Sequence, residues 1–138
     1  MAQRRKKYVE IEEDNGTVLR YVHHELGGGL VEKSARVDPT AYVGASAYVD
    51  AGARVGAGAR IGAAAWIDAG AVVREGATVG SAAHVGRNAV VGRGATVGAR
   101  AKLGVRVRVE DGARLESDAI VPTGAVVRGG RRNRPTAA

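Results

Sequence analysis

The sequence predicts an all-β solenoid, and three features of residues 35–127 predict it. An aliphatic residue recurs at every sixth position without interruption. Alanine stands two residues before each of these positions, with Val107 as the only substitute. Glycine or asparagine often stands three residues after them, as at Gly52 and Asn88. A repeat this short indicates a solenoid. The sixteen aliphatic positions are Val37, Val43, Val49, Val55, Ile61, Ile67, Val73, Val79, Val85, Val91, Val97, Leu103, Val109, Leu115, Val121 and Val127.

Each hexad combines a short extended stretch with a tight corner. Side chains alternate along a strand, so the alanine and the aliphatic residue point inward and the residue between them points outward. Glycine and asparagine enter the left-handed region of backbone space at low cost, which places the corner at their position. Only a small residue fits beside a corner, and this explains the alanine.

This pattern resembles the hexapeptide-repeat family, in which three hexads make one triangular coil of a left-handed parallel β-helix. The resemblance covers roughly residues 30–129 and implies about five coils. It supplies the handedness, because crossovers between parallel strands are otherwise usually right-handed. With three hexads per coil, residues 18 apart in the sequence stack in columns.

Four segments are expected along the chain: a basic tail (1–7), a β-hairpin cap with a glycine linker (8–29), the solenoid (30–129) and a second basic tail (130–138). Asn15-Gly16 lies between two alternating apolar stretches and predicts a type I′ turn. Because the end of a solenoid is an open sheet edge, we expect the hairpin to cover the first coil.

One part of the repeat departs from the rule. Residues 99–111 carry Arg100 and Arg106 at the corner position, and residues 105–109 alternate like a plain strand. Arginine with a positive φ angle is uncommon. We therefore expect a local distortion here, or a corner opened into a longer strand.

The net charge of +7 is concentrated at the two ends of the chain. Residues 8–127 hold 13 basic and 14 acidic residues, so the body is close to neutral and a nucleic-acid groove along it is not expected. The tails are either solvated ends or candidates for weak contact with a polyanion. Their basic residues are Arg4, Arg5, Lys6, Lys7, Arg128, Arg131, Arg132 and Arg134.

Several classes of protein are disfavoured by composition. The chain has no cysteine, which excludes disulfides and thiolate metal sites. It has no apolar run of membrane-spanning length and no apolar stretch of signal-peptide type after its basic start. We therefore expect no membrane contact, no secretory signal and a cytoplasmic or virion-associated protein.

Two outward columns carry the candidate sites. The first holds Tyr48, Trp66, His84 and Lys102, beside Asp50 and Asp68. It is interpreted as a structural ladder or a partner-binding stripe, with a ligand site on Trp66 and His84 as the alternative. The second runs beside four glycines and forms a bare face suited to a homo-oligomer, with a trimer favoured. These glycines are Gly44, Gly62, Gly80 and Gly98.

The sequence favours a non-enzymatic scaffold or assembly module with no cofactor. No hexad is interrupted by the loop that usually shapes the acceptor pocket in acyltransferases of the resembling family. Residues 28–32 resemble the entry of some bacterial and phage hexapeptide proteins, so a phage structural protein is one candidate. A second alternative is a protein that polymerises end to end.

The enzymatic alternative is a trimeric hexapeptide acyltransferase that uses acyl-CoA. The resemblance implies a histidine as general base, and His84 is the candidate, because histidine can exchange protons near neutral pH. A zinc enzyme of γ-carbonic anhydrase type would need three histidines, whereas the repeat region has only His84. We therefore expect no metal site.

Overall fold

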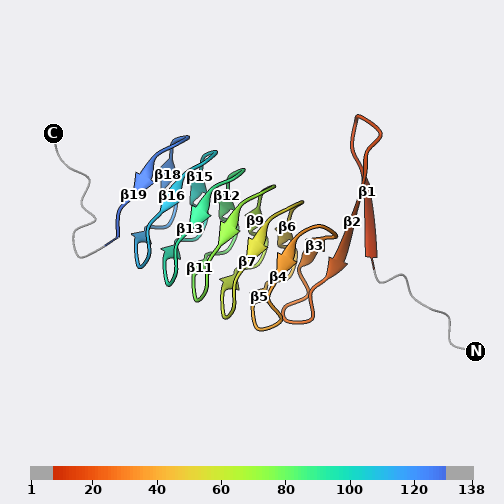
Figure 1. The fold of residues 1–138 in the computed structure, drawn as a ribbon, viewed down its shortest axis with the longest axis horizontal. Helices are drawn as coiled ribbons and strands as arrows, with labels where there is room; N and C mark the ends of the chain where they lie inside the picture. The colour runs from red at the N-terminus through yellow and green to blue at the C-terminus, as the bar shows by residue number, and fades with distance from the viewer. Residues whose placement is uncertain (1–7, 130–138) are drawn as a thin grey trace, which may run out of the picture.

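The computed structural model describes residues 8–129 and shows a triangular left-handed β-helix built from stacked parallel coils (Figure 1). The basic residues predicted for the two tails lie outside the described residues, except Arg128, whose side chain is exposed. Within residues 8–129 there is no helix, and none that could cross a membrane. The prediction of an all-β solenoid is confirmed.

The aromatic face is the eight-stranded sheet β1-β2-β3-β6-β9-β12-β15-β18. Its first three strands are β1 (Tyr8–Glu12), β2 (Val18–His23) and β3 (Leu30–Glu32). The others are β6 (Tyr48–Val49), β9 (Trp66–Ile67), β12 (His84–Val85), β15 (Lys102–Leu103) and β18 (Ile120–Val121).

The other two faces are shorter sheets of two-residue strands. The arginine–valine face contains β4 (Arg36–Val37), β7 (Arg54–Val55), β10 (Val72–Val73), β13 (Val90–Val91), β16 (Arg108–Val109) and β19 (Val126–Val127). The threonine face contains β5 (Tyr42–Val43), β8 (Arg60–Ile61), β11 (Thr78–Val79), β14 (Thr96–Val97) and β17 (Arg114–Leu115). Every parallel pair in the helix joins residues 18 apart, as His84 joins Trp66 and Lys102, which confirms the predicted columns.

The core is a thin column of alanine and aliphatic side chains. From Ala41 to Ala113 every inward residue is at most 3% exposed, and Val107 takes the alanine position without disturbance. At the C-terminal end Leu115, Val121 and Val127 are only partly buried, because no described coil stacks on them. Burial of the aliphatic side chains is the main source of stability, at about 25 cal/mol per Å² of apolar surface.

The corners have positive φ angles at every sixth residue from Ser46 to Gly124, as predicted from the glycines. Half of these residues are not glycine, and they include Arg100 (φ 60°) and Arg106 (φ 57°). The distortion expected at residues 99–111 is therefore wrong. The Arg106 amide donates to the Arg87 carbonyl one coil back at 2.9 Å, and Arg100 bonds Ser81 in the same way. These bonds offset the roughly 1–2 kcal/mol that a side chain costs in this conformation.

The hairpin caps the solenoid by extending one of its sheets, not by lying over the end of the coil. Strand β2 pairs antiparallel with β3, and β3 pairs parallel with β6 (Figure 1). The predicted type I′ turn is wrong, because Gly16 has a positive φ (84°) and Asn15 does not. Glu13 N donates to Thr17 O and Gly16 N donates to Glu13 O, the pattern of a type I turn followed by a left-handed glycine.

The glycines of the threonine face have a reason within the chain. A Cβ atom on Gly80 would lie 2.5 Å from the Ala99 backbone nitrogen, and one on Gly62 would lie 2.6 Å from that of Ser81. Each glycine thus lets the next coil approach. That Gly44, Gly62, Gly80 and Gly98 form an oligomer face stays a prediction.

We expect Gly80→Ala to destabilise the protein more than Gly58→Ala. Gly58 is a corner with φ 66° and open space around it, so alanine costs about 1 kcal/mol there. At Gly80 the added methyl group meets backbone, which costs roughly 1–3 kcal/mol or more. Urea unfolding of the two variants measures this difference, and equal losses would contradict the close-approach explanation.

Candidate active site

His84 and Asp68 form a side-chain pair on the aromatic face. His84 begins β12, and Asp68 directly follows β9 one coil earlier. The His84 Nε2 atom lies 3.1 Å from Asp68 Oδ2, and the side chains are 31% and 17% exposed. Asp68 Oδ1 accepts a hydrogen bond from the Ala69 amide at 2.7 Å. The backbone therefore fixes the carboxylate, which leaves its second oxygen for the imidazole.

This pair decides which imidazole nitrogen is available for proton transfer. A carboxylate only accepts hydrogen bonds, so the contact favours a proton on Nε2. The Nδ1 atom is then left with its lone pair, and no residue of 8–129 bonds it. A partly exposed histidine oriented by an aspartate is the arrangement that supports general-base chemistry.

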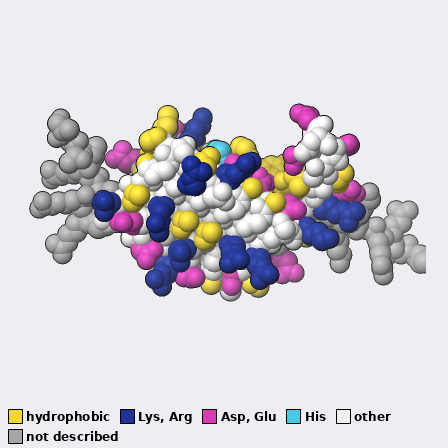
Figure 2. Space-filling model, turned by 45° about the horizontal axis from the view of Figure 1, so that its top comes forward, with side chains coloured by type: hydrophobic (Ala, Val, Ile, Leu, Met, Phe, Trp, Pro, Cys, Tyr) yellow, Lys and Arg dark blue, Asp and Glu magenta, His cyan; other side chains and the backbone are white. Residues whose placement is uncertain are grey.

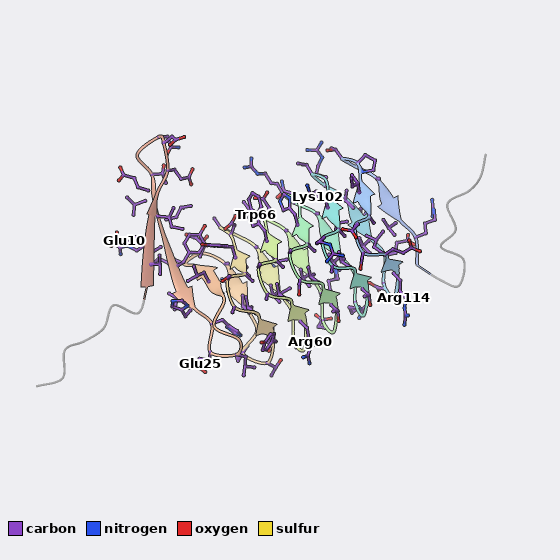
Figure 3. All side chains as sticks on the ribbon, turned by 180° about the vertical axis from the view of Figure 1, so that it is seen from behind. Glu10, Glu25, Arg60, Trp66, Lys102 and Arg114 are labelled. Atoms are coloured by element: carbon purple, nitrogen blue, oxygen red, sulfur yellow. The ribbon has the colours of Figure 1, made fainter. Side chains whose placement is uncertain are left out.

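A ring stack holds His84 from the preceding coil. Trp66 and His84 have ring centroids 4.1 Å apart and an angle of 9° between their planes. Trp66 Nε1 donates to Asp50 Oδ2 at 2.5 Å, so the indole repeats the ring-to-aspartate contact of His84 one coil lower. Figure 3 shows Trp66 and Lys102 projecting from the same side of the prism.

Tyr21 joins this cluster from the hairpin. Its side chain is 4% exposed, and its hydroxyl donates to Asp50 Oδ1 at 2.8 Å. Burial, followed by the hydrogen bond to Asp50, raises the pKa of Tyr21 above its ordinary range. The Tyr21 ring also meets Tyr48 edge to face, with centroids 5.7 Å apart. No local sequence signal marks Tyr21, because this contact depends on how β2 registers against β3.

The structure thus brings together three of the four stripe residues, Tyr48, Trp66 and His84, around Asp50 and Asp68. Lys102 stands next to His84 in register, but its side chain is exposed and no bond joins the two. His23 and His24 lie away from the stripe and contact the carbonyls of Gly28 and Ala41. Among residues 8–129 no group of three possible metal ligands occurs.

The neighbouring arginine–valine face offers positive charge. Arg36 and Arg54 stand in register on β4 and β7, and with Arg74 they line a shallow open depression. All three arginine side chains are exposed, and Asp38 and Glu75 also line the depression. Figure 2 shows Lys and Arg side chains in several separate groups with acidic side chains between them, so no continuous basic stripe appears in that view.

Comparison with known proteins identifies the family. The sequence model of the GMPPB C-terminal domain family matches residues 26–132. The chain belongs to the GMPPB C-terminal domain family. No curated protein sequence matches the chain significantly. The match covers the solenoid with His84 and Asp68, but not Tyr21.

Solved structures similar to this family member are acetyltransferases. GDP-perosamine N-acetyltransferase (PerB) of Caulobacter crescentus, in complex with CoA and GDP-perosamine, is 38% identical over 75% of this chain, with a TM-score of 0.72. A variant of it with one histidine replaced by asparagine is 36% identical over 75%, with a TM-score of 0.70. The chain spans 50% and 49% of these two structures, about half their length.

A more distant structure supports the fold alone. A hexapeptide transferase family protein of Anaplasma phagocytophilum is 19% identical over 72% of this chain and 73% of its own, with a TM-score of 0.57. These similarities confirm the hexapeptide-repeat superfamily to which the repeat pointed.

The expectation of a non-enzymatic scaffold or phage structural protein is wrong. The structures similar at 36–38% identity are acetyltransferases with CoA bound, which favours the acyltransferase alternative over the scaffold and the end-to-end polymer. The absence of an inserted loop was therefore a poor guide to function.

The Tyr21–Asp50 bond predicts a stability change at alkaline pH. Tyr21 in the folded chain stays protonated beyond pH 10, where an unfolded tyrosine ionises, so ionisation favours the unfolded state. The stabilisation is complete below about pH 10 and is lost above it, by up to about 1.4 kcal/mol per pH unit. Urea unfolding at a series of pH values should show a shallower decline for Tyr21→Phe. Parallel declines of the two proteins would contradict the assignment.

Proposed function

We propose that this chain is an acyltransferase that moves an acyl group from acyl-CoA to the amino group of a nucleotide-linked amino sugar. The His84–Asp68 pair carries the proposal, because it presents an oriented base on an exposed face. The similarity to acetyltransferase structures that hold CoA and GDP-perosamine supports the two substrate classes. This chain spans about half the length of those acetyltransferases, so their activity is assigned to it only as a proposal.

The proposed reaction uses His84 twice. The acceptor nitrogen attacks the thioester carbonyl carbon, and its proton passes to His84 Nδ1. The tetrahedral intermediate then collapses with cleavage of the carbon–sulfur bond, and the CoA sulfur takes up the proton from the imidazolium. Asp68 positions the ring and stabilises its charged form, which is the role of the aspartate in His–Asp pairs.

Neighbouring residues would bind the substrates. A shallow hollow beside Trp66, lined also by Tyr21, Tyr48 and Asp50, offers apolar rings with one carboxylate for an acceptor. Arg36 and Arg54 repel each other across the strand spacing, so an anion between them would be stabilised. We assign the phosphates of one substrate to that depression.

We also propose a homo-oligomer, with a trimer favoured. The hollows on residues 8–129 are open, so a second copy would supply the missing wall of a site on the aromatic face. Sedimentation that finds only monomer at assay concentration would argue against this part of the proposal.

The test is CoA release from acetyl-CoA in the presence of a nucleotide-linked amino sugar. The chain has no cysteine, so a thiol reagent reads only the released CoA. We expect His84→Gln to lower kcat by roughly 10²–10⁴-fold, and Asp68→Asn by about 100-fold or more. Arg87→Ala is a matched control, because Arg87 is exposed in the corner after β12.

Two results would overturn the proposed function. One is the absence of acceptor-dependent CoA release by folded wild-type protein over a panel of amino-sugar nucleotides. The other is turnover that is equal in His84→Gln and the wild type.

A further inference from the structure

The N-terminal hairpin is connected to His84 by an unbroken series of side-chain contacts. The Tyr21 hydroxyl donates to Asp50 Oδ1 at 2.8 Å, and Trp66 Nε1 donates to Asp50 Oδ2. The indole then stacks on the imidazole at 4.1 Å. Each contact restricts one rotation of the next side chain. Tyr21 orients the carboxylate plane of Asp50, Asp50 sets the tilt of Trp66, and Trp66 sets the ring plane of His84.

The distribution of acidic residues on this face indicates that these contacts do not arise from the coil register alone. Asp50 and Asp68 occupy the position directly after their strands, and Gly86 and Gly104 fill that position in the next two coils. Asp50 and Asp68 each bond a ring nitrogen one coil further on, on Trp66 and His84. Glu32, the acid 18 residues before Asp50, bonds Ser34 instead. The backbone does not need an acid at this position, since glycine serves equally well in the later coils.

Tyr21, at the start of this series of contacts, is held in place by its burial. Its side chain is 4% exposed, and the Tyr48 ring packs against it edge to face. The strand that carries it is bonded along β3, with Tyr21 opposite Glu32 and His23 opposite Leu30. Tyr21 thus stands on a strand that is paired on both edges, whereas Trp66 lies on a two-residue strand with an exposed outer side and Asp50 directly follows another.

We propose that the hairpin completes the active site, with Tyr21 acting through Asp50 and Trp66 to hold the imidazole of His84 in its working plane. Tyr21, Asp50 and Trp66 are positioning residues, because none of them needs to touch the reacting atoms. The expected effect on kcat rests on the proposed function, whereas the claim that Tyr21 orients His84 through Asp50 and Trp66 does not.

The structural claim can be tested without activity, because Trp66 is the chain's single tryptophan. An imidazole stacked on an indole quenches its fluorescence, so the emission of Trp66, compared with that in His84→Gln, reports the Trp66–His84 stack. Asp68 and Lys102 are the charged groups beside His84, and both stay in every variant. His84→Gln should abolish the quenching and so identifies its source.

Tyr21→Phe removes the hydroxyl and keeps the ring. We expect the ratio of stacked to unstacked indole to fall about fivefold, the equivalent of one ordinary hydrogen bond, with a smaller quenching amplitude. Tyr42→Phe is the matched control, because Tyr42 lies on the threonine face against Arg60. If Tyr21→Phe does not fold, Asp50→Asn is read in the same way, since an amide can accept only through its one oxygen.

Steady-state kinetics separates a positioning role of Tyr21 from a purely structural one. We expect Tyr21→Phe to lower kcat about fivefold with KM little changed, while Tyr42→Phe leaves both unchanged. Equal quenching amplitudes in Tyr21→Phe, Tyr42→Phe and the wild type would overturn the proposal. An unchanged kcat despite reduced quenching would overturn it as well. If the wild type quenches as described but turns over no substrate, the proposed function fails and the contact network stands.

Discussion

Everything in this molecule depends on the stacking of one coil directly on the next. From β4 onward each strand has only two residues, which is too short for stability alone, so the ladder bonds between coils must all form in one register. The thin core allows no other arrangement, because the inward alanine and aliphatic positions leave no room for a larger side chain. Glycines such as Gly62 and Gly80 let the backbones approach, and the corner amides bond the coil below.

That same constraint builds the candidate site. A register of 18 residues puts His84 directly over Trp66, and it puts each ring nitrogen within reach of the aspartate that ends the strand one coil back. No loop, insertion or helix is needed to bring these groups together. The rigid coil also explains how short, exposed strands can hold an imidazole in one orientation, which catalysis by proton transfer requires.

The sequence was a good guide wherever structure follows from periodicity. The hexads predicted the sheets, the columns, the core and the positions of the corners. It was a poor guide where a backbone bond outweighs a residue preference, as at Arg100 and Arg106, which keep left-handed corners. The turn at Gly16 differs because the loop holds three residues between its closing bonds, not two.

The role of Tyr21 could not be predicted, because an antiparallel pairing between β2 and β3 decides where it lies. Function was misjudged for a related reason. The stripe of Tyr48, Trp66 and His84 was visible in the sequence, but its hydrogen bonds to Asp50 and Asp68 depend on side-chain geometry across coils. The uninterrupted repeat appeared to argue against an acyltransferase, whereas the similar solved structures are acetyltransferases.

A crystal structure of the protein grown with CoA would test directly whether His84 lies at the acyl-transfer site. We expect CoA on the aromatic face, with its sulfur within about 3.5 Å of His84 Nδ1, the distance at which reacting atoms meet. We also expect a second copy of the chain to close the other side of the site. CoA bound elsewhere on the prism, with His84 facing only solvent, would contradict the role of His84 as the base.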